Sequence, residues 1–161
     1  MIILGVDPGL IKTGWGIIKK INNSISYISS GTIKTKTDIP IGERLKNINY
    51  ELDKIIKEYC PNEFAIEITF VNDNAVSSLK LGQARGVAIL TAALNNLEVF
   101  EYSPNQIKKT VTGVGKARKE QVGMMVKCLL PAVNLKTEDE ADALAIAICH
   151  CSFSNSFKNN I

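Results

Sequence analysis

The stretch IILGVDPG (residues 2–9) decides how the rest of this chain is interpreted. A short apolar run that ends at turn residues is typical of a strand buried on both faces of a sheet. Asp7 lies where that strand ends, and an ionised carboxylate at the edge of an apolar sheet is costly unless a metal ion or another polar group pairs with it. Taken alone, the stretch is explained more simply by a turn at Asp7-Pro8-Gly9. Whether Asp7 binds a metal ion or only forms a turn therefore depends on where the other acidic residues lie.

The composition is that of an ordinary globular protein. Of the 161 residues, 45% are hydrophobic and 22% are charged, which is enough for one domain with a sizeable core. We expect a single domain over residues 1–152 and a flexible polar tail over residues 153–161. No apolar run approaches the about 20 residues of a membrane-spanning helix. The first residues do not resemble a secretory signal, so we expect a cytoplasmic protein.

The four cysteines show neither a disulfide framework nor a Cys-x-x-Cys pair. The run Cys149-His150-Cys151 resembles a metal-binding motif, but it lies at the end of an apolar helix and no second pair of ligands is nearby. We therefore expect reduced thiols rather than a zinc site.

Hydrophobic periodicity predicts an α/β domain with a mixed sheet. Three consecutive strands with short turns suggest an antiparallel meander, although the alternation in the third is imperfect. Ser103 and Pro104 are a good helix start, and Gly113 is a good helix end. The predicted strands cover residues 2–7, 14–18, 25–34, 64–70 and 98–102. The predicted helices cover residues 45–59, 75–94, 104–112, 119–130 and 141–149.

Two glycines share one face of the predicted helix over residues 75–94. Gly82 and Gly86 are four residues apart, and residues at that spacing lie above one another on a helix. Glycine lets another backbone approach closely. The pair therefore indicates either tight packing on the sheet or helix–helix contact across a dimer.

Three further carboxylates can reach Asp7. Glu67 lies in an apolar strand, which a right-handed crossover would make the parallel neighbour of the first strand. Asp139 and Asp142 are three residues apart near the start of a helix and project from one face. Acidic residues there also complement the helix dipole, and Thr137 with Glu140 forms a capping box. Four converging carboxylates would repel one another unless Mg²⁺ or Mn²⁺ bound, and two such ions can hydrolyse a phosphodiester.

Charge is distributed unevenly along the chain, although the net charge is only +3. Residues 137–142 contain four acids and no base, whereas residues 104–119 contain five basic residues and no acid. One surface therefore suits cations and another suits a polyanion. The basic residues are Lys108, Lys109, Lys116, Arg118 and Lys119.

Four segments resemble the RuvC family of bacterial Holliday-junction resolvases, in the RNase H-like superfamily. They are GVDPG (residues 5–9), FAIE (64–67), LKLGQARGVA (79–88) and DALAIA (142–147). The resemblance implies an RNase H-like α/β fold, with a five-stranded mixed sheet in the order 3-2-1-4-5 flanked by helices. It also implies a homodimeric endonuclease that nicks four-way DNA junctions symmetrically and leaves ligatable 5′-phosphate and 3′-hydroxyl ends. RuvA and RuvB, the branch-migration proteins, are the implied partners.

The resemblance also implies roles for individual residues. Asp7, Glu67, Asp139 and Asp142 match the catalytic metal ligands, which hold Mg²⁺, or Mn²⁺ in its place, with two ions expected in each site. Lys108 and Lys119 match basic residues used in junction binding or catalysis, and Lys109, Lys116 and Arg118 extend that stretch. Arg85 is expected to contact a phosphate or the dimer partner.

Phe70 matches an aromatic residue that meets unpaired bases near the crossover, and any base can stack on an exposed aromatic ring. Core packing at the end of the strand is the alternative. Two residues depart from the family pattern. Glu140 replaces a small residue between two metal ligands and could disturb metal affinity, and Asp73 stands where lysine is common.

Three other functions fit parts of the sequence. One is another RNase H-type nuclease that cuts a different substrate. A second is an actin-like ATPase or sugar kinase, because Asp7-Pro8-Gly9 resembles a phosphate-binding hairpin; those enzymes need two similar domains, for which this chain is short. The third is a non-catalytic junction-binding protein, against which the presence of all four acids argues.

Overall fold

A computed structural model of the chain describes residues 1–69 and 74–158. Its five strands form one mixed sheet in the order β3-β2-β1-β4-β5, as predicted. The strands are β1 (Ile2–Asp7), β2 (Lys12–Ile21), β3 (Ser24–Lys34), β4 (Glu63–Glu67) and β5 (Val99–Tyr102). The helices are α1 (Ile41–Tyr59), α2 (Ala75–Leu94), α3 (Pro104–Thr112), α4 (Lys119–Leu129) and α5 (Glu138–Lys158).

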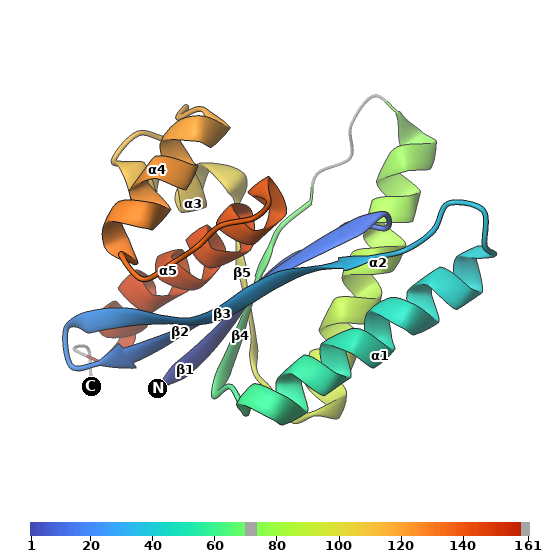
Figure 1. Ribbon diagram of the computed structural model, residues 1–161, viewed down its shortest axis with the longest axis horizontal. Helices are drawn as coiled ribbons and strands as arrows, with labels where there is room; N and C mark the ends of the chain where they lie inside the picture. Colours follow the sequence, from blue (N-terminus) through green and yellow to red (C-terminus); the bar gives the residue numbers. More distant parts are fainter. Residues whose placement is uncertain (70–73, 159–161) are drawn as a thin grey trace.

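Helices cover both faces of the sheet (Figure 1). Helices α1 and α2 lie together on one face, whereas α3, α4 and α5 lie on the other. Each face has its own hydrophobic core. In the described ranges no helix is both long and apolar enough to cross a bilayer.

Strand β1 lies at the centre of the sheet and directs Asp7 toward α5. It pairs antiparallel with β2 and parallel with β4. Leu4 and Val6 pack into the core beneath α1 and α2, and Ile3 packs into the core beneath α5. Since side chains alternate along a strand, Asp7 follows Ile3 onto the α5 face.

Two glycines let the backbone of α5 lie directly on the sheet. A Cβ atom at Gly5 would collide with the carbonyl oxygen of Ala143, and one at Gly14 would collide with the carbonyl oxygen of Asp139. Gly14 also pairs with Asp7 in the β1–β2 ladder. Because glycine has no side chain at these two positions, the first turns of α5 can lie over the strand ends that carry the acids.

The predicted limits of α3 are confirmed. The Ser103 hydroxyl accepts a hydrogen bond from the backbone N–H of Gln106, and the Gln106 side chain accepts one from the Ser103 N–H, so both halves of a capping box are present. Pro104 opens the helix, and Gly113 closes it with a φ of 81°, a conformation that glycine adopts without strain.

The imperfect alternation in β3 has a structural cause. The β2–β3 register shifts between Ile17 and Ile18, so that Ile17 pairs with Ser29 but Ile18 pairs with Tyr27. Ile28 is the extra residue of this bulge. Tyr27 packs into the α5-side core and Ile28 into the opposite core. The bulge therefore lets both neighbouring side chains pack in a hydrophobic core.

Several predicted boundaries were wrong: β2, α1 and α5 begin earlier than predicted, and β2 also ends later. β4 ends at Glu67 rather than at residue 70, because its partner β5 ends at Tyr102, opposite Glu67. One further bond of 2.8 Å joins the Ile68 N–H to the Tyr102 carbonyl oxygen. Helix α5 runs to Lys158, although the sequence predicted its end at residue 149. No glycine or proline interrupts that segment, and Phe153 stacks on Tyr102, with ring centroids 5.6 Å apart. The flexible tail over residues 153–161 stays a prediction.

Candidate active site

Three of the four predicted acids line one pocket at the ends of β1 and β4. Asp7 and Glu67 are the last residues of these parallel strands, and Asp142 reaches the pocket from α5. The pocket has a volume of about 180 Å³. Its remaining lining consists of two lysines and a few residues without charge: Lys108, Lys119, Pro104, Ile107, Val122 and Ala145.

Burial and mutual repulsion disfavour the charged forms of two of these acids. Desolvation raises the pKa of Asp7 to about 7, and the negative charges of Glu67 and Asp142 contribute to the rise. Desolvation also raises the pKa of Glu67, again with a contribution from Asp142. Lys119 lowers both pKa values, but it does not offset the rise. The pocket thus concentrates negative charge for which its own side chains compensate only in part.

The two acids of α5 are placed differently. Asp142 forms an ion pair with Lys119, with 3.0 Å between Oδ2 and Nζ. Asp139 does not line the pocket, but its charge still contributes to the raised pKa of Asp7. It starts the same helical turn as Asp142, and its backbone rests on Gly14.

The donor set fits a hard divalent cation. Every available ligand atom is a carboxylate oxygen, as Mg²⁺ and Mn²⁺ prefer, and a bound cation would relieve the repulsion that raises the two pKa values. Within residues 1–69 and 74–158, however, no three acidic, histidine or cysteine side chains stand close enough together to hold one ion. The Lys119 ammonium occupies one carboxylate oxygen of Asp142, Oδ2, in this arrangement.

Comparison with known proteins identifies the family. The family model described as crossover junction endodeoxyribonuclease RuvC matches residues 3–150. The chain is 49% identical to the RuvC of Brucella suis biovar 1 over 96% of its own length and 89% of that protein. It is 51% identical to the RuvC of Rhizobium etli over 92% of its length and 88% of that protein. The chain belongs to the RuvC family.

Solved structures agree with that assignment. The structure of T. thermophilus RuvC in complex with a Holliday junction substrate superposes with a TM-score of 0.91 at 28% identity, covering 98% of this chain and 96% of that chain. RuvC proteins are crossover junction endodeoxyribonucleases and metal-dependent enzymes. The family decides among the functions that the sequence left open, in favour of the junction endonuclease.

The basic residues predicted between residues 104 and 119 lie in three different places. Lys108 and Lys119 line the acidic pocket itself. Lys109 and Lys116 line a separate depression between α3 and the loop that follows it. Arg118 is the N-cap residue of α4, where its backbone N–H donates to the Gln121 side chain.

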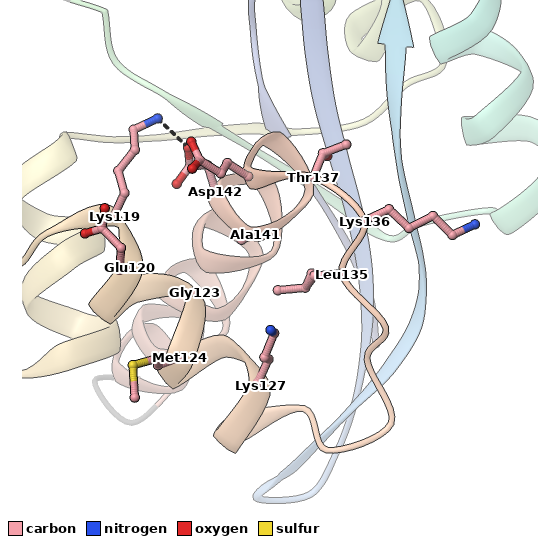
Figure 2. A pocket seen from close by; sticks show the side chains of 11 residues that line it. Lys119, Glu120, Gly123, Met124, Lys127, Leu135, Lys136, Thr137, Ala141 and Asp142 are labelled. Carbon is pink, nitrogen blue, oxygen red and sulfur yellow. Dashed lines mark hydrogen bonds and ion pairs between the residues drawn. The ribbon is translucent and has the colours of Figure 1, made fainter.

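A second pocket shares the Lys119–Asp142 ion pair with the acidic pocket (Figure 2). It opens between α4 and the loop that leads into α5, and both members of the ion pair line it as well. The dashed line in Figure 2 marks their bond at one end of the pocket. The Lys119–Asp142 pair therefore lines both pockets.

Arg85 contacts its own protein rather than standing free. Its Nε donates to the backbone oxygen of Glu67 over 3.1 Å, and its guanidinium forms an ion pair with Glu101. It thereby ties α2 to the end of β4, next to a predicted metal ligand. A role in DNA binding or dimer contact stays a prediction.

Sequence reasoning missed Arg44. This buried side chain donates to the Thr35 hydroxyl over 3.1 Å and to the Leu10 carbonyl oxygen over 3.2 Å. It thus supports the loop that follows Asp7. Its position on the stripe of Ile48 and Leu52, at a spacing of four residues, is a signal that could have revealed it.

The metal-like run of Cys149, His150 and Cys151 lies just past the middle of α5. Cys149 and Cys151 are free and buried. Both ring nitrogens of His150 are used, with Nδ1 lying 2.7 Å from the Tyr102 hydroxyl and Nε2 lying 2.7 Å from Oε2 of Glu63. Phe70 and Asp73, the two residues predicted to influence contact with the crossover, lie outside the described residues.

Proposed function

We propose that this chain is a Mg²⁺-dependent Holliday-junction resolvase in which Asp7, Glu67, Asp139 and Asp142 hold the metal. The observation that carries the proposal is the pocket that Asp7, Glu67 and Asp142 share. Its carboxylate oxygens, at the ends of rigid elements, suit hard divalent ions, and we propose two ions in each site, with Mn²⁺ able to replace Mg²⁺. Bound there, such ions supply a hydroxide nucleophile and stabilise the leaving oxygen of a phosphodiester.

The remaining residues of the pocket bind and orient the DNA. If a metal took the place of Lys119 at Asp142, the ammonium would be free to contact a phosphate. Lys108 faces the same pocket and neutralises part of the phosphate charge. Lys109, Lys116 and Arg118 lie on the elements that flank the pocket, and we propose that they track the DNA backbone. We keep Phe70 as the residue that stacks on unpaired bases and Arg85 as a further DNA contact.

We also propose that the enzyme is a homodimer formed through α2. On this helix Leu79 and Leu90 are 70% and 55% exposed, and Gly82 and Gly86 lie between them with open space where a side chain would be. The spacing of these four residues places them on one face. A two-fold dimer offers two active sites to a junction that itself has two equivalent strands.

Each subunit would nick one of two strands of like polarity, leaving 5′-phosphate and 3′-hydroxyl ends. We propose RuvA and RuvB as partners and the cytoplasm as the location, since the substrate arises during recombination and repair of chromosomal DNA.

The test uses a synthetic four-way junction with one strand labelled at a time. We expect paired symmetric nicks that require Mg²⁺ or Mn²⁺, that ligase reseals, and that disappear in Asp7→Asn. A linear duplex and an RNA–DNA hybrid of the same sequence serve as controls. Cleavage of the hybrid in preference to the junction, or full cleavage by Asp7→Asn, would contradict the proposal.

A further inference from the structure

The acidic residue between the two metal ligands of α5 is buried on the opposite side of the helix. Glu140 is only 4% exposed, and its Oε2 accepts a hydrogen bond of 3.0 Å from the Ser30 hydroxyl on β3. The same oxygen accepts from the backbone N–H of Lys136 over 3.4 Å, and Oε1 accepts from the Thr137 hydroxyl over 3.4 Å. In the described part of the chain no lysine or arginine forms an ion pair with it. Hydrogen bonds alone thus hold this buried carboxylate.

Thr137 joins the same network from the start of α5. Its hydroxyl oxygen caps the helix by accepting the Glu140 N–H over 3.2 Å, and it lies 2.9 Å from the Thr32 hydroxyl on β3. The predicted capping box is therefore present in a modified form, because Glu140 reaches back to the N–H of Lys136 instead of Thr137. We call Ser30, Thr32, Thr137 and Glu140 the β3 clasp.

The sheet connects the β3 clasp to the metal site. Thr32 pairs with Gly14, and Gly14 pairs with Asp7, so these three residues form one row across β3, β2 and β1. Neighbouring strands are about 4.8 Å apart, which fixes the separation of Thr32 from Asp7. The first turn of α5 crosses this row, held to β3 by the clasp and resting on Gly14 through the backbone of Asp139.

We propose that Glu140 is a positioning residue for metal binding: through the β3 clasp it sets where Asp139 and Asp142 stand relative to Asp7. The proposal rests on the proposed function of these acids as metal ligands. Glu140 points away from the pocket and touches neither metal nor substrate, so its effect passes through the backbone of α5. Residues that support metal ligands from behind typically contribute 10–100-fold to metal affinity.

Four variants separate positioning from charge and from stability. Glu140→Leu breaks the clasp and removes a charge. Glu140→Gln removes the charge but keeps an oxygen that can accept the same bonds. Ser30→Ala keeps the charge and removes one bond. Thr91→Val is the matched control, because Thr91 is a buried threonine that bonds Asn49 between α2 and α1, in the opposite core.

The measurement is the Mg²⁺ concentration that gives half of the maximal shift in the thermal unfolding midpoint, with cleavage of a junction titrated in parallel. We expect Glu140→Leu to raise this concentration at least 10-fold and Ser30→Ala to raise it several-fold. The half-saturating Mg²⁺ concentration of Glu140→Gln should stay within about 3-fold of that of the unmodified protein, because the glutamine oxygen can accept the same hydrogen bonds. Thr91→Val should lower the thermal unfolding midpoint without changing the half-saturating Mg²⁺ concentration.

Two results would overturn the proposal. One is a Glu140→Leu protein that unfolds at a lower temperature yet binds Mg²⁺ like the unmodified chain, which would make the clasp merely structural. The other is an equal loss of Mg²⁺ affinity in Glu140→Gln and Glu140→Leu, with no loss in Ser30→Ala. That result would assign the effect to the charge of Glu140. Asp7→Asn keeps the two proposals distinguishable: if it binds Mg²⁺ normally, the proposed metal site itself is wrong.

Discussion

The Nζ atom of Lys119 lies 3.0 Å from Oδ2 of Asp142, beside the pocket that also holds Asp7 and Glu67. The bond to Asp142 raises the pKa of Lys119, so the ammonium stays charged. In the metal-free protein this ammonium compensates part of the carboxylate charge. If Asp142 holds a metal ion as proposed, Lys119 competes with that ion for the carboxylate.

Lys119→Met should consequently strengthen Mg²⁺ binding but weaken cleavage. Without the ammonium, Asp142 is free to bind a cation, and we expect the half-saturating Mg²⁺ concentration in thermal unfolding to fall several-fold. Cleavage of a junction at saturating Mg²⁺ should fall by about 100-fold, the usual effect of removing one group that stabilises developing charge.

Lys109→Met is the control for that experiment, because Lys109 lines a different depression and does not line the acidic pocket. It should leave the Mg²⁺ titration unchanged and weaken junction binding only modestly. If Lys119→Met instead weakened Mg²⁺ binding, the competition between ammonium and metal would be wrong.

Asp7→Asn should make the metal-free protein more stable at high pH. The pKa of Asp7 is about 7 in the folded chain, against 3.8 for an ordinary aspartate. Between these values the folded state holds a proton that the unfolded state releases, so stability falls as the pH rises through this range. At pH 8 in EDTA, removing the charge should raise the free energy of unfolding by up to about 4 kcal/mol, at about 1.4 kcal/mol for each pKa unit.

The gain should shrink as the pH falls toward 4, close to the ordinary pKa of 3.8, because ionisation of Asp7 in the unfolded state then favours unfolding only slightly. Added Mg²⁺ should stabilise the unmodified protein more than Asp7→Asn. The difference in free energy of unfolding between the two proteins at pH 8 should therefore become smaller. Urea unfolding at pH 5 and pH 8 measures both effects. Asp38→Asn, in an exposed loop, is the control and should show neither.

Local patterns predicted the framework of this site, because each depends on residues close together in the chain. The apolar run into Asp7 marks the end of a strand, and the crossover rule makes β4 its parallel neighbour, which brings Glu67 alongside. Helical spacing places Asp139 and Asp142 on one face. Ser103 and Gly113 predicted both ends of α3.

The contacts that tune the site could not be predicted in this way, because they join side chains distant in sequence. Ser30 and Glu140 are 110 residues apart, and the bulge that displaces Ile28 also changes which β3 side chains face α5. Arg85 shows the same limit. Its segment suggested DNA or dimer contact, but its bond to the Glu67 carbonyl depends on how α2 packs beside β4.

Gly14→Ala should displace the metal ligands of α5. A methyl group at this position would collide with the carbonyl oxygen of Asp139, so the helix must move away from the row that contains Asp7. We expect a loss of about 1–3 kcal/mol in the free energy of unfolding, together with weaker Mg²⁺ binding. Gly42→Ala is the matched control, since it lies in α1 with open space around it. It should be neutral or slightly stabilising.

Leu90→Glu should convert the proposed dimer to a monomer without unfolding it. Leu90 is 55% exposed on the face of α2 that also carries Gly82 and Gly86. A charge there costs little in a monomer, but in a two-fold interface it would meet its own copy or an apolar surface. Light scattering should give half the mass of the unmodified protein, and paired nicking of a junction should be lost. Tyr50→Glu replaces an equally exposed apolar residue of α1, 56% exposed, and should stay dimeric. A dimer in Leu90→Glu would place the interface elsewhere.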